Sequence, residues 1–484
     1  MTPITRRAFV LGMGGTVLSS ALGSQASATP PRVVVIGAGL AGLAAAYELM
    51  QAGVDVRLAE QSQRPGGRVK TIRGHFAGDA WVDVGGQLSG AGYANFFYYA
   101  NKFGLELEPT PPFAARPGVL LHLNGKLHTS ADLHDQPDDW PLALAEHEKP
   151  VAPARLLRHY LQPVAAEIAT VDRVLHPDYA HYNDLSLLEY LRQAGATPAA
   201  IGLIEQSLNY NSLATVSALS ALRDAVRSLH SAGSQTMNIK NGNSSLPEAF
   251  ANELGQRIHY QAKVTSLSYT DNGAQLQIDT QRDREVWEAD RVVIAIPFTA
   301  LRKVAFDTPL PDARRRMVEE LPYTQVAQTY VQTSRQFWQS SEPVAAVYTD
   351  GPLERLFNGS AKMPTGHGLL INWINGAGTA AVRGLAVEEQ AEFTLRGIAK
   401  IWPGSEKFVE RTFVNNWGNS YAEGAYAHYA PGQMRRFAVA IPRPVGCLHF
   451  AGEHTELVAP GMEGALTSGR RAATEILNST IPAT

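Results

Sequence analysis

Short apolar runs, some uninterrupted and some with helical spacing, divide this chain into predicted strands and helices. Residues 31–36 read Pro-Arg-Val-Val-Val-Ile, a β-branched run that suits a strand buried on both faces of a parallel sheet. Good helix formers fill residues 43–50, and a second strand is predicted at residues 54–59. This order of strand, helix and strand indicates an α/β fold that begins near residue 31.

The middle of the chain continues the mixture of helices and strands. Residues 185–193 and 216–229 have the spacing of amphipathic helices. Residues 326–331 and 368–373 are strand-like, and residues 289–297 form an apolar run that predicts another buried strand. A helical segment is therefore expected before the last third of the chain and a sheet-rich segment after it.

Composition limits the classes of function. The chain has 484 residues, of which 45% are hydrophobic and 18% charged, and it carries a formal net charge of −3. At roughly 150 residues per domain, this length corresponds to about three domains or to one large domain of two lobes. The hydrophobic fraction is sufficient for a buried core. The balanced charge gives no electrostatic basis for binding nucleic acid. The basic run at residues 314–316 is interpreted as the solvated face of a helix, because Glu319 and Glu320 follow it.

Cysteine and metal chemistry are also restricted. Cys447 is the single cysteine, so an intrachain disulfide and a cysteine-based zinc site are excluded. It lies in the apolar run of residues 445–450, where a cysteine is usually a small buried hydrophobe. No His-Glu-x-x-His motif or comparable cluster is present, and we expect no metal.

The N-terminus has the pattern of an export signal. Arg6 and Arg7 form a twin-arginine pair, an apolar stretch covers residues 9–22, and Ala26-Ser27-Ala28 is a small-residue cleavage site. The apolar stretch is shorter than the about 20 residues that cross a bilayer. We therefore expect cleavage after Ala28 and a periplasmic mature protein without a stable membrane anchor.

A dinucleotide-binding motif follows the first predicted strand. It reads Gly37-x-Gly39-x-x-Gly42, with Leu40 and Ala41 opening the helix, and Glu60 ends the second strand. In such a unit the glycines allow a tight turn and a close approach to pyrophosphate, while the helix N-terminus offers free N–H groups. The acid would accept hydrogen bonds from ribose hydroxyls. The complete strand–glycine–helix–strand–acid order makes the motif specific.

Two further glycine pairs favour FAD over NAD. Gly66-Gly67-Arg68 follows the acid and resembles a segment of FAD enzymes of the glutathione-reductase-like class. Arg68 would bind phosphate or cover the flavin. Gly85-Gly86-Gln87 resembles the next flavin-contacting turn of these enzymes, with a surface hairpin as the alternative interpretation.

The C-terminal region completes a resemblance to the flavin-containing amine oxidases, which include monoamine, polyamine and L-amino-acid oxidases. Its motifs are Gly452-Glu453 and, after Gly461, Met462-Glu463-Gly464-Ala465. The resemblance implies that the Gly452-Glu453 motif contacts the ribityl and phosphate region of FAD. It also implies that the motif starting at Met462 presents a helix N-terminus to the flavin pyrimidine. It also implies that the backbone of Val264 holds the adenine.

The resemblance further implies three residues with chemical roles. Lys303, six residues after Pro297, would hold a water molecule at the flavin N5 atom, unless it is a surface lysine. Tyr426 would form one wall of an aromatic cage that favours an ammonium group, and Trp417 would pack near the flavin. The alternative for both aromatic residues is a place in the core.

Departures from the family pattern narrow the function. Ala425 stands where monoamine oxidases have a flavin-linked cysteine, so noncovalent FAD is expected. Gly461 replaces the second cage aromatic, which opens the cage to larger substrates. The segment at residues 85–93 holds no arginine that would grip a carboxylate, which weakens the reading as an L-amino-acid oxidase.

The sequence therefore predicts an FAD-dependent amine oxidase of two lobes, a Rossmann-like FAD lobe and a substrate lobe with a mixed or antiparallel sheet and helices. Expected partners are a small amine, O₂ or a periplasmic electron carrier, and a second chain in a homodimer. Alternatives are an L-amino-acid oxidase, a related desaturase or protoporphyrinogen-type oxidase, and a flavin-binding protein without turnover. The predicted FAD lobe comprises residues 30–90, 235–300 and 440–484, and the substrate lobe residues 91–234 and 301–439.

Overall fold

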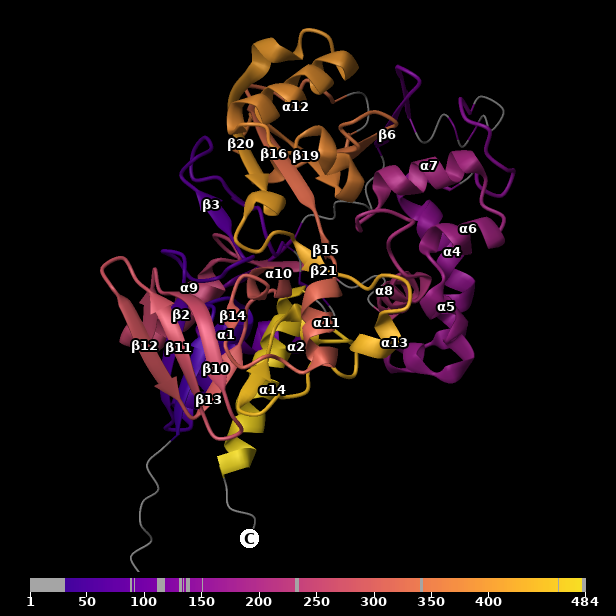
Figure 1. Ribbon diagram of the computed structural model, residues 1–484. Helices are drawn as coiled ribbons and strands as arrows, with labels where there is room; N and C mark the ends of the chain where they lie inside the picture. The colour runs from indigo at the N-terminus through magenta and orange to yellow at the C-terminus, as the bar shows by residue number, and fades with distance from the viewer. Residues whose placement is uncertain are drawn as a thin grey trace, which may run out of the picture. The chain divides into compact units, whose positions relative to one another are not determined.

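A computed structural model describes residues 31–480, apart from residues 88, 91, 111–117, 130–132, 134, 136–139, 150, 231–234, 340–342 and 460 (Figure 1). The predicted export signal and its cleavage site after Ala28 lie outside the described residues. The described residues belong to one compact unit that begins at Pro31.

Strand β1 lies in the middle of a five-stranded parallel sheet. The strand order is β22 (Leu448–Phe450), β13 (Arg291–Ile294), β1 (Arg32–Ile36), β2 (Asp55–Glu60) and β9 (Ile258–Tyr260). Val33 and Val35 pack into the apolar cluster on one face, and Val34 and Ile36 into the cluster on the other. Burial on both faces explains why this strand is a continuous β-branched run.

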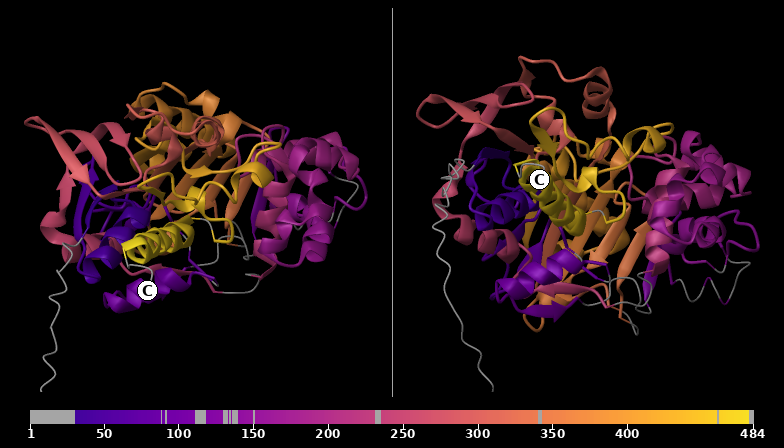
Figure 2. Two further views of the ribbon diagram at one scale, coloured as in Figure 1. Left: turned by 60° about the horizontal axis from the view of Figure 1, so that its bottom comes forward. Right: turned by 90° about the horizontal axis from the view of Figure 1, so that it is seen from below.

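Four helices from the beginning, the middle and the end of the chain cover one face of this sheet. They are α1 (Leu40–Gln51), α2 (Ala94–Lys102), α9 (Ser245–Leu254) and α14 (Gly461–Thr480). In both views of Figure 2, α14 (yellow) lies beside the indigo N-terminal elements. The two long helices approach closely, because a Cβ added to Gly469 on α14 would lie 2.2 Å from the carbonyl oxygen of Ala41 on α1.

The other face of the parallel sheet packs against a second, four-stranded sheet. Its strand order is β12 (Arg284–Ala289), β11 (Ala274–Asp279), β10 (Lys263–Tyr269) and β14 (Ala305–Phe306). Leu276, Ile278 and Trp287 from this sheet share an apolar cluster with Val34 and Ile36. This part of the fold therefore has three layers: the helices, the parallel sheet and a mostly antiparallel sheet.

A seven-stranded mixed sheet forms the second large body of strands. Its order is β20 (Val409–Asn416), β16 (Val326–Thr333), β19 (Gly368–Asn375), β18 (Arg355–Asn358), β17 (Ala346–Thr349), β6 (Val119–Leu123) and β7 (Lys126–Thr129). Three two-stranded ribbons connect parts of the fold: β3 (Thr71–Arg73) with β4 (Trp81–Asp83), β5 (Leu107–Pro109) with β8 (Met237–Ile239), and β15 (Tyr323–Thr324) with β21 (Tyr426–Ala427).

The remaining helices include a group that packs around α4 and α8. The group is α4 (Pro153–Ile168), α5 (His181–Asp184), α6 (Leu187–Gln193), α7 (Pro198–Ser207) and α8 (Ala218–His230). Elsewhere lie α10 (Phe298–Leu301), α11 (Asp312–Glu320), α12 (Val387–Ile401) and α13 (Met434–Phe437). The helices predicted at residues 185–193 and 216–229 are α6 and α8, and the strands predicted at residues 326–331 and 368–373 are β16 and β19. The predicted α/β class is confirmed, whereas the limits drawn for the two lobes stay a prediction.

The interpretation of residues 314–316 as a solvated face is wrong for its first residue. Arg314 is only 4% exposed, and its guanidinium donates hydrogen bonds to the carbonyl oxygens of Ala440, Ile441 and Arg443. Arg315 does lie on the surface, paired with Asp312 and Glu319. Arg314 therefore fastens α11 to the loop before β22, which a charge pattern along one helix does not reveal.

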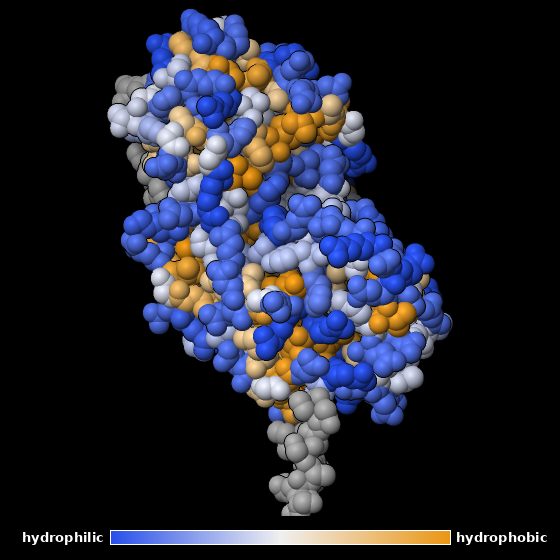
Figure 3. All heavy atoms as spheres, turned by 90° about the vertical axis from the view of Figure 1, so that its left-hand side faces the viewer, coloured by the Kyte–Doolittle hydropathy of each residue, from blue (hydrophilic) through white to orange (hydrophobic). Residues whose placement is uncertain are grey.

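The polar and apolar side chains on one face of the molecule can be followed in Figure 3. Over the face shown in Figure 3, polar side chains predominate and apolar ones form separate smaller areas. No helix within the described residues combines the length and the apolar character needed to cross a bilayer.

The contact between α1 and α14 generates the first prediction. Gly469→Ala places a methyl group against the backbone of Ala41, so we expect a loss of about 1–3 kcal/mol in the free energy of unfolding. Gly202→Ala on α7 is the matched control, because nothing lies within 4 Å of its added Cβ. That helical glycine should gain about 0.5–1 kcal/mol when replaced by alanine. Urea unfolding measures both, and equal effects would contradict the close helix contact.

Candidate active site

The first glycine turn joins β1 to α1 at the carboxyl end of the parallel sheet. Gly37 has φ +98° and donates its N–H to the carbonyl of Ala59 on β2 (2.8 Å). A Cβ on Gly42 would lie 1.9 Å from the Gly37 oxygen, so helix and turn touch. A Cβ on Gly39 would meet nothing within 4 Å, and α1 has neither a side-chain cap nor an acid in its first turn. Open space in front of an uncapped helix N-terminus, here Leu40 and Ala41, suits a phosphate.

Glu60 lies where β2 ends beside this turn. Its carboxylate is 8% exposed and accepts the N–H groups of Ala38 (2.7 Å) and Ser62 (2.8 Å). A carboxylate has about four lone-pair sites, so acceptor capacity remains for hydroxyl groups. The backbone N–H of Ala262 donates to the Glu60 carbonyl oxygen (2.9 Å), which brings the start of β10 and Val264 to the same edge.

The second glycine turn packs directly on the first. The N–H of Gly66 donates to the carbonyl of Ala38 (2.7 Å), and a Cβ on Gly67 would lie 3.4 Å from the Cα of Gly39. Arg68 then reaches across to the C-terminal half of the chain. Its guanidinium donates to the Glu453 carboxylate (2.8 Å) and to the Ala425 carbonyl (3.0 Å).

The third glycine turn is held against both halves of the chain. A Cβ on Gly85 would lie 1.9 Å from the Arg68 oxygen, and one on Gly86 would lie 2.8 Å from the Met462 side chain. The side-chain amide of Asn243 donates to the carbonyls of Gly86 (2.9 Å) and Gln87 (3.2 Å). The structure thus brings the three predicted glycine turns and the Met462 segment together, and we call this assembly the glycine seam.

Trp417 supports the third turn from the side of the seven-stranded sheet. It is 7% exposed, and its indole N–H donates to the carbonyl of Val84, the residue before Gly85 (3.0 Å). Trp417 is therefore a buried residue that fixes the glycine seam.

The first turn of α14 is tied to the first turn of α2. The Glu463 carboxylate, predicted as part of the cofactor site, accepts the backbone N–H groups of Asn95 and Phe96 and the side-chain amide of Asn95, each at 2.9 Å. These N–H groups open α2, and an anion is favourable at a helix N-terminus. The Glu463 side chain therefore fastens α2 to α14, while Gly461 and Ala465 flank it on α14.

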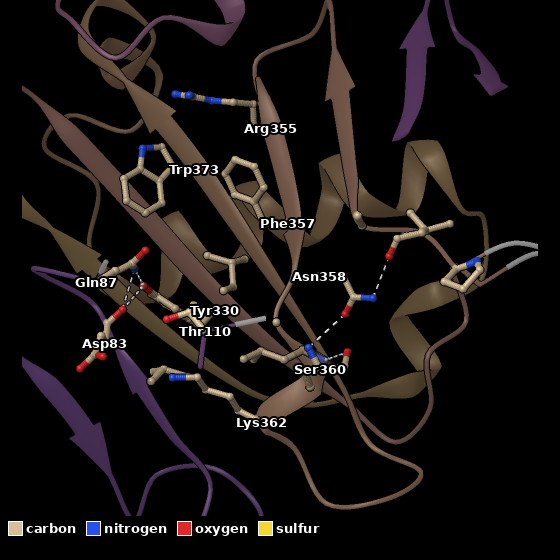
Figure 4. Close-up of a pocket in the computed structure, with 18 of the residues that line it drawn as sticks. Asp83, Gln87, Thr110, Tyr330, Arg355, Phe357, Asn358, Ser360, Lys362 and Trp373 are labelled. Atoms are coloured by element: carbon tan, nitrogen blue, oxygen red, sulfur yellow. Dashed lines mark hydrogen bonds between the residues drawn. The ribbon is translucent and has the colours of Figure 1, made fainter. Parts of the chain in front are cut away.

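A cavity of about 680 Å³ lies on the seven-stranded sheet, and we call it the aromatic cavity (Figure 4). Tyr330, Phe357 and Trp373 come from its strands, and Asp83 and Lys362 lie at the end near Gln87. Burial raises the pKa of Asp83 to about 6 and lowers the pKa of Lys362 to about 8. The Lys362 ammonium lies 3.3 Å from the centre of the Trp81 ring, a cation–π contact.

A larger cavity of about 1050 Å³ adjoins the first, and we call it the tyrosine cavity. Residues such as Asn209 and Trp373 line both cavities. Tyr93, Tyr426, Glu453 and Gly461 line the tyrosine cavity where it meets the glycine seam. The Tyr426 hydroxyl donates to the Asn209 carbonyl (2.9 Å), and burial raises the pKa of Tyr426 to about 12, so this residue stays a neutral phenol.

The structure does not bring Lys303 to these cavities. Lys303 lies in the turn after α10 with its side chain 55% exposed, and its ammonium pairs with the carboxylate of Glu423 in the loop before β21. Helix α10 lies between Pro297 and Lys303. The sixth residue after Pro297 therefore falls in the turn that follows this helix. The flavin role of Lys303 stays a prediction.

Sequence reasoning missed several polar residues around the seam. Gln328 is 1% exposed on β16, accepts a hydrogen bond from Asn415 (2.9 Å), and leaves its amide nitrogen without a partner in the described part of the chain. The signal for it was a glutamine inside an otherwise buried strand. Arg223, which lines the tyrosine cavity, is tied to Asp224 (2.9 Å), and Tyr93 joins the same lining.

Two buried histidines near the Glu453 turn stay neutral. The His454 ring is 4% exposed, and burial together with Arg68, Arg314 and Arg471 holds its pKa well below the usual range. His428 is 1% exposed, and burial lowers its pKa to about 4. The His428 ring meets the Thr324 hydroxyl at 3.1 Å.

His428 therefore makes folding sensitive to acid. Below about pH 6.5 the unfolded chain protonates this histidine while the folded chain does not, so folding stability falls as pH decreases toward 4. Between pH 7.5 and 4, His428→Gln should lose roughly 3 kcal/mol less free energy of unfolding than the wild type. Urea unfolding at a series of pH values measures the difference, and His159→Gln at an exposed site is the control. Parallel curves for wild type and His428→Gln would contradict the burial argument.

Comparisons with known proteins agree with this assembly. Residues 40–477 match the family model described as flavin containing amine oxidoreductase. YobN of Bacillus subtilis (strain 168) is 28% identical over 469 residues, which cover 94% of this chain and 96% of that protein. The L-amino-acid oxidase of Pseudechis australis is 25% identical over 467 residues, covering 94% and 88%.

A solved structure shows the same fold. Cyclohexylamine oxidase from Brevibacterium oxydans IH-35A superposes with a TM-score of 0.76 at 21% identity, covering 93% of this chain and 99% of that chain. The family model begins at the start of α1, directly after Gly39, and extends into α14. The chain therefore belongs to the flavin-containing amine oxidoreductase family, and it is an oxidoreductase that acts on amines.

Proposed function

We propose that this protein holds FAD without a covalent bond and oxidises a primary or secondary amine to an imine, which hydrolyses to an aldehyde or ketone. The observation that carries the proposal is the meeting of three glycine turns with the start of α14 beside the tyrosine cavity. O₂ or an electron carrier would reoxidise the cofactor.

The residues of the seam fit FAD. The space at Gly39 and the uncapped start of α1 suit the phosphates, and Glu60 with the adjoining backbone of Val264 suits the adenosine. Gly85, Gly86 and Met462 would meet the flavin end, since they continue the same seam. When bound, FAD accepts a hydride equivalent from the carbon next to the substrate nitrogen.

Two residues support noncovalent binding of FAD. Ala425 precedes Tyr426 and offers no nucleophile. Cys447 is the single cysteine and is fully buried in an apolar cluster. Burial also raises the pKa of its thiol, which keeps the thiol protonated and unreactive.

The tyrosine cavity would receive the amine. The ring of Tyr426 borders it, and the hydrogen bond of its hydroxyl to Asn209 fixes the orientation of the ring. An electron-rich ring face attracts an ammonium group and positions it. The apolar side chains of the adjoining aromatic cavity exclude water from the rest of the substrate.

L-Amino acids are the second candidate substrate class, favoured by relatives such as the Pseudechis australis enzyme, which is named for that activity. Their carboxylate needs a cation. Three arginines line the tyrosine cavity: Arg223 and Arg227 both pair with Asp224, and Arg158 is solvent-exposed. We therefore place simple amines first.

The twin-arginine pattern at Arg6 and Arg7 supports export of the folded, FAD-loaded protein and a periplasmic site of action. Fractionation of cells that express the full chain, with an Arg6→Lys/Arg7→Lys variant as the control, tests this part of the proposal.

The glycine seam gives a prediction that separates cofactor binding from folding. Gly39→Ala should leave the folding of the FAD-free protein unchanged, because Gly39 has φ −71° and open space, yet weaken FAD binding at least 10-fold. Gly42→Ala should instead lower folding stability, because its Cβ would lie 1.9 Å from the Gly37 oxygen. Fluorescence titration with FAD and urea unfolding measure the two effects. Normal FAD affinity in Gly39→Ala would remove this turn from the cofactor site.

The substrate class is tested by anaerobic reduction of the bound flavin. Phenethylamine and L-phenylalanine differ only in the carboxylate, and we expect the amine to bleach the flavin faster. Tyr426→Ala should reduce the efficiency of bleaching by about 2- to 30-fold, which corresponds to the usual strength of a cation–π contact. Tyr426→Phe keeps the ring and should stay within about threefold of wild type. Faster bleaching by L-phenylalanine would move the amino-acid assignment to first place.

A further inference from the structure

Gly461 leaves room beside the glycine seam, and a tyrosine from another segment fills it. Gly461 has φ +71° and no side chain, and it lines the tyrosine cavity. A Cβ added to Gly461 would lie 3.3 Å from the hydroxyl oxygen of Tyr93, and no other heavy atom comes closer. Tyr93 thus occupies the space into which a side chain at position 461 would extend.

The position of Tyr93 is fixed by bonds on either side of this contact. Tyr93 directly precedes α2, and its ring packs edge-to-face on Phe96 with centroids 6.2 Å apart. Glu463, two residues after Gly461, accepts the N–H groups of Asn95 and Phe96. The start of α2 and the start of α14 are therefore locked together at the point where Tyr93 meets Gly461.

Tyr93 lines the tyrosine cavity, and its hydroxyl lies beside Gly461, another residue of the lining. No residue in the described ranges forms a hydrogen bond with the Tyr93 hydroxyl, while the hydroxyl of Tyr426 is bound to Asn209. Both tyrosines line the same cavity, one from the start of α2 and one from β21. Two tyrosines from chain segments far apart in the sequence thus line one cavity.

We propose that Tyr93 is a specificity-determining residue that forms the second aromatic wall of the amine site in place of residue 461, and that it limits the width of the amine that enters. This inference rests on the proposed amine oxidation. Wide aryl-methylamines are excluded by the Tyr93 ring, whereas slim alkylamines pass between Tyr93 and Tyr426. The ring, rather than the hydroxyl, sets this limit.

The test compares two amines in anaerobic stopped-flow reduction of the FAD-loaded protein. The probes are n-hexylamine, which is slim, and 1-naphthylmethylamine, which is wide. Tyr93→Ala should raise the ratio of second-order rate constants, wide over slim, at least 10-fold above wild type. Tyr93→Phe should keep the ratio within threefold. Tyr98→Ala, at a 46% exposed position on α2, is the matched control and should also leave the ratio unchanged.

Tyr93→Leu provides a second variant, because it keeps an apolar contact with Phe96 while it removes the ring. FAD content and the urea midpoint of each variant establish that the fold is retained. An unchanged ratio in both Tyr93→Ala and Tyr93→Leu, or an equal change in Tyr93→Phe, overturns the proposal.

A failure of the proposed function gives a different result. If neither amine reduces the wild-type flavin, amine oxidation fails for these probes, and the wall is tested by binding alone. Dissociation constants are then read from the perturbation of the flavin absorption band. Tighter binding of 1-naphthylmethylamine relative to n-hexylamine in Tyr93→Ala supports the wall, and an unchanged ratio overturns it.

Discussion

The approach of backbone to backbone at the glycine seam is the constraint on which the rest of the structure depends. A Cβ at Gly42 would lie 1.9 Å from the Gly37 oxygen, and a Cβ at Gly85 would lie 1.9 Å from the Arg68 oxygen. No side chain fits at these distances, so the turns must be glycine before the surrounding strands and helices can pack. Because the turns stack in this way, an uncapped helix N-terminus and a buried carboxylate come to lie at one end of a continuous seam.

Long-range polar contacts then close the seam with the far end of the chain. Arg68 binds Glu453, and Glu463 holds the start of α2. The Arg68–Glu453 pair is largely buried, so removal of either partner would leave a buried charge without compensation. These contacts explain how a cofactor site can be built from turns at both ends of the sequence, and why the C-terminal helix is as much a part of it as the N-terminal motif.

Local sequence patterns predicted the parts of this site that depend on neighbouring residues. The β-branched run of β1, the spacing of Gly37, Gly39 and Gly42, and the helix periodicity of α8 are all properties of short segments. Pairings between distant segments were not accessible in this way. The position of Lys303 was predicted from its spacing after Pro297, and that spacing does not reveal its ion pair with Glu423. The burial of Arg314, the capping of α2 by Glu463, and the contact of Tyr93 with Gly461 each require knowledge of which helices meet.

The most direct test of the central claim is an experimental structure of the purified protein with its cofactor. We expect one FAD without a covalent bond to the protein, with its phosphates at Gly39 and the start of α1 and its adenosine at Glu60. The flavin ring should lie along Gly85, Gly86 and Met462 and face the tyrosine cavity between Tyr93 and Tyr426. A flavin ring placed away from that cavity, or a covalent bond to the chain, would contradict the account.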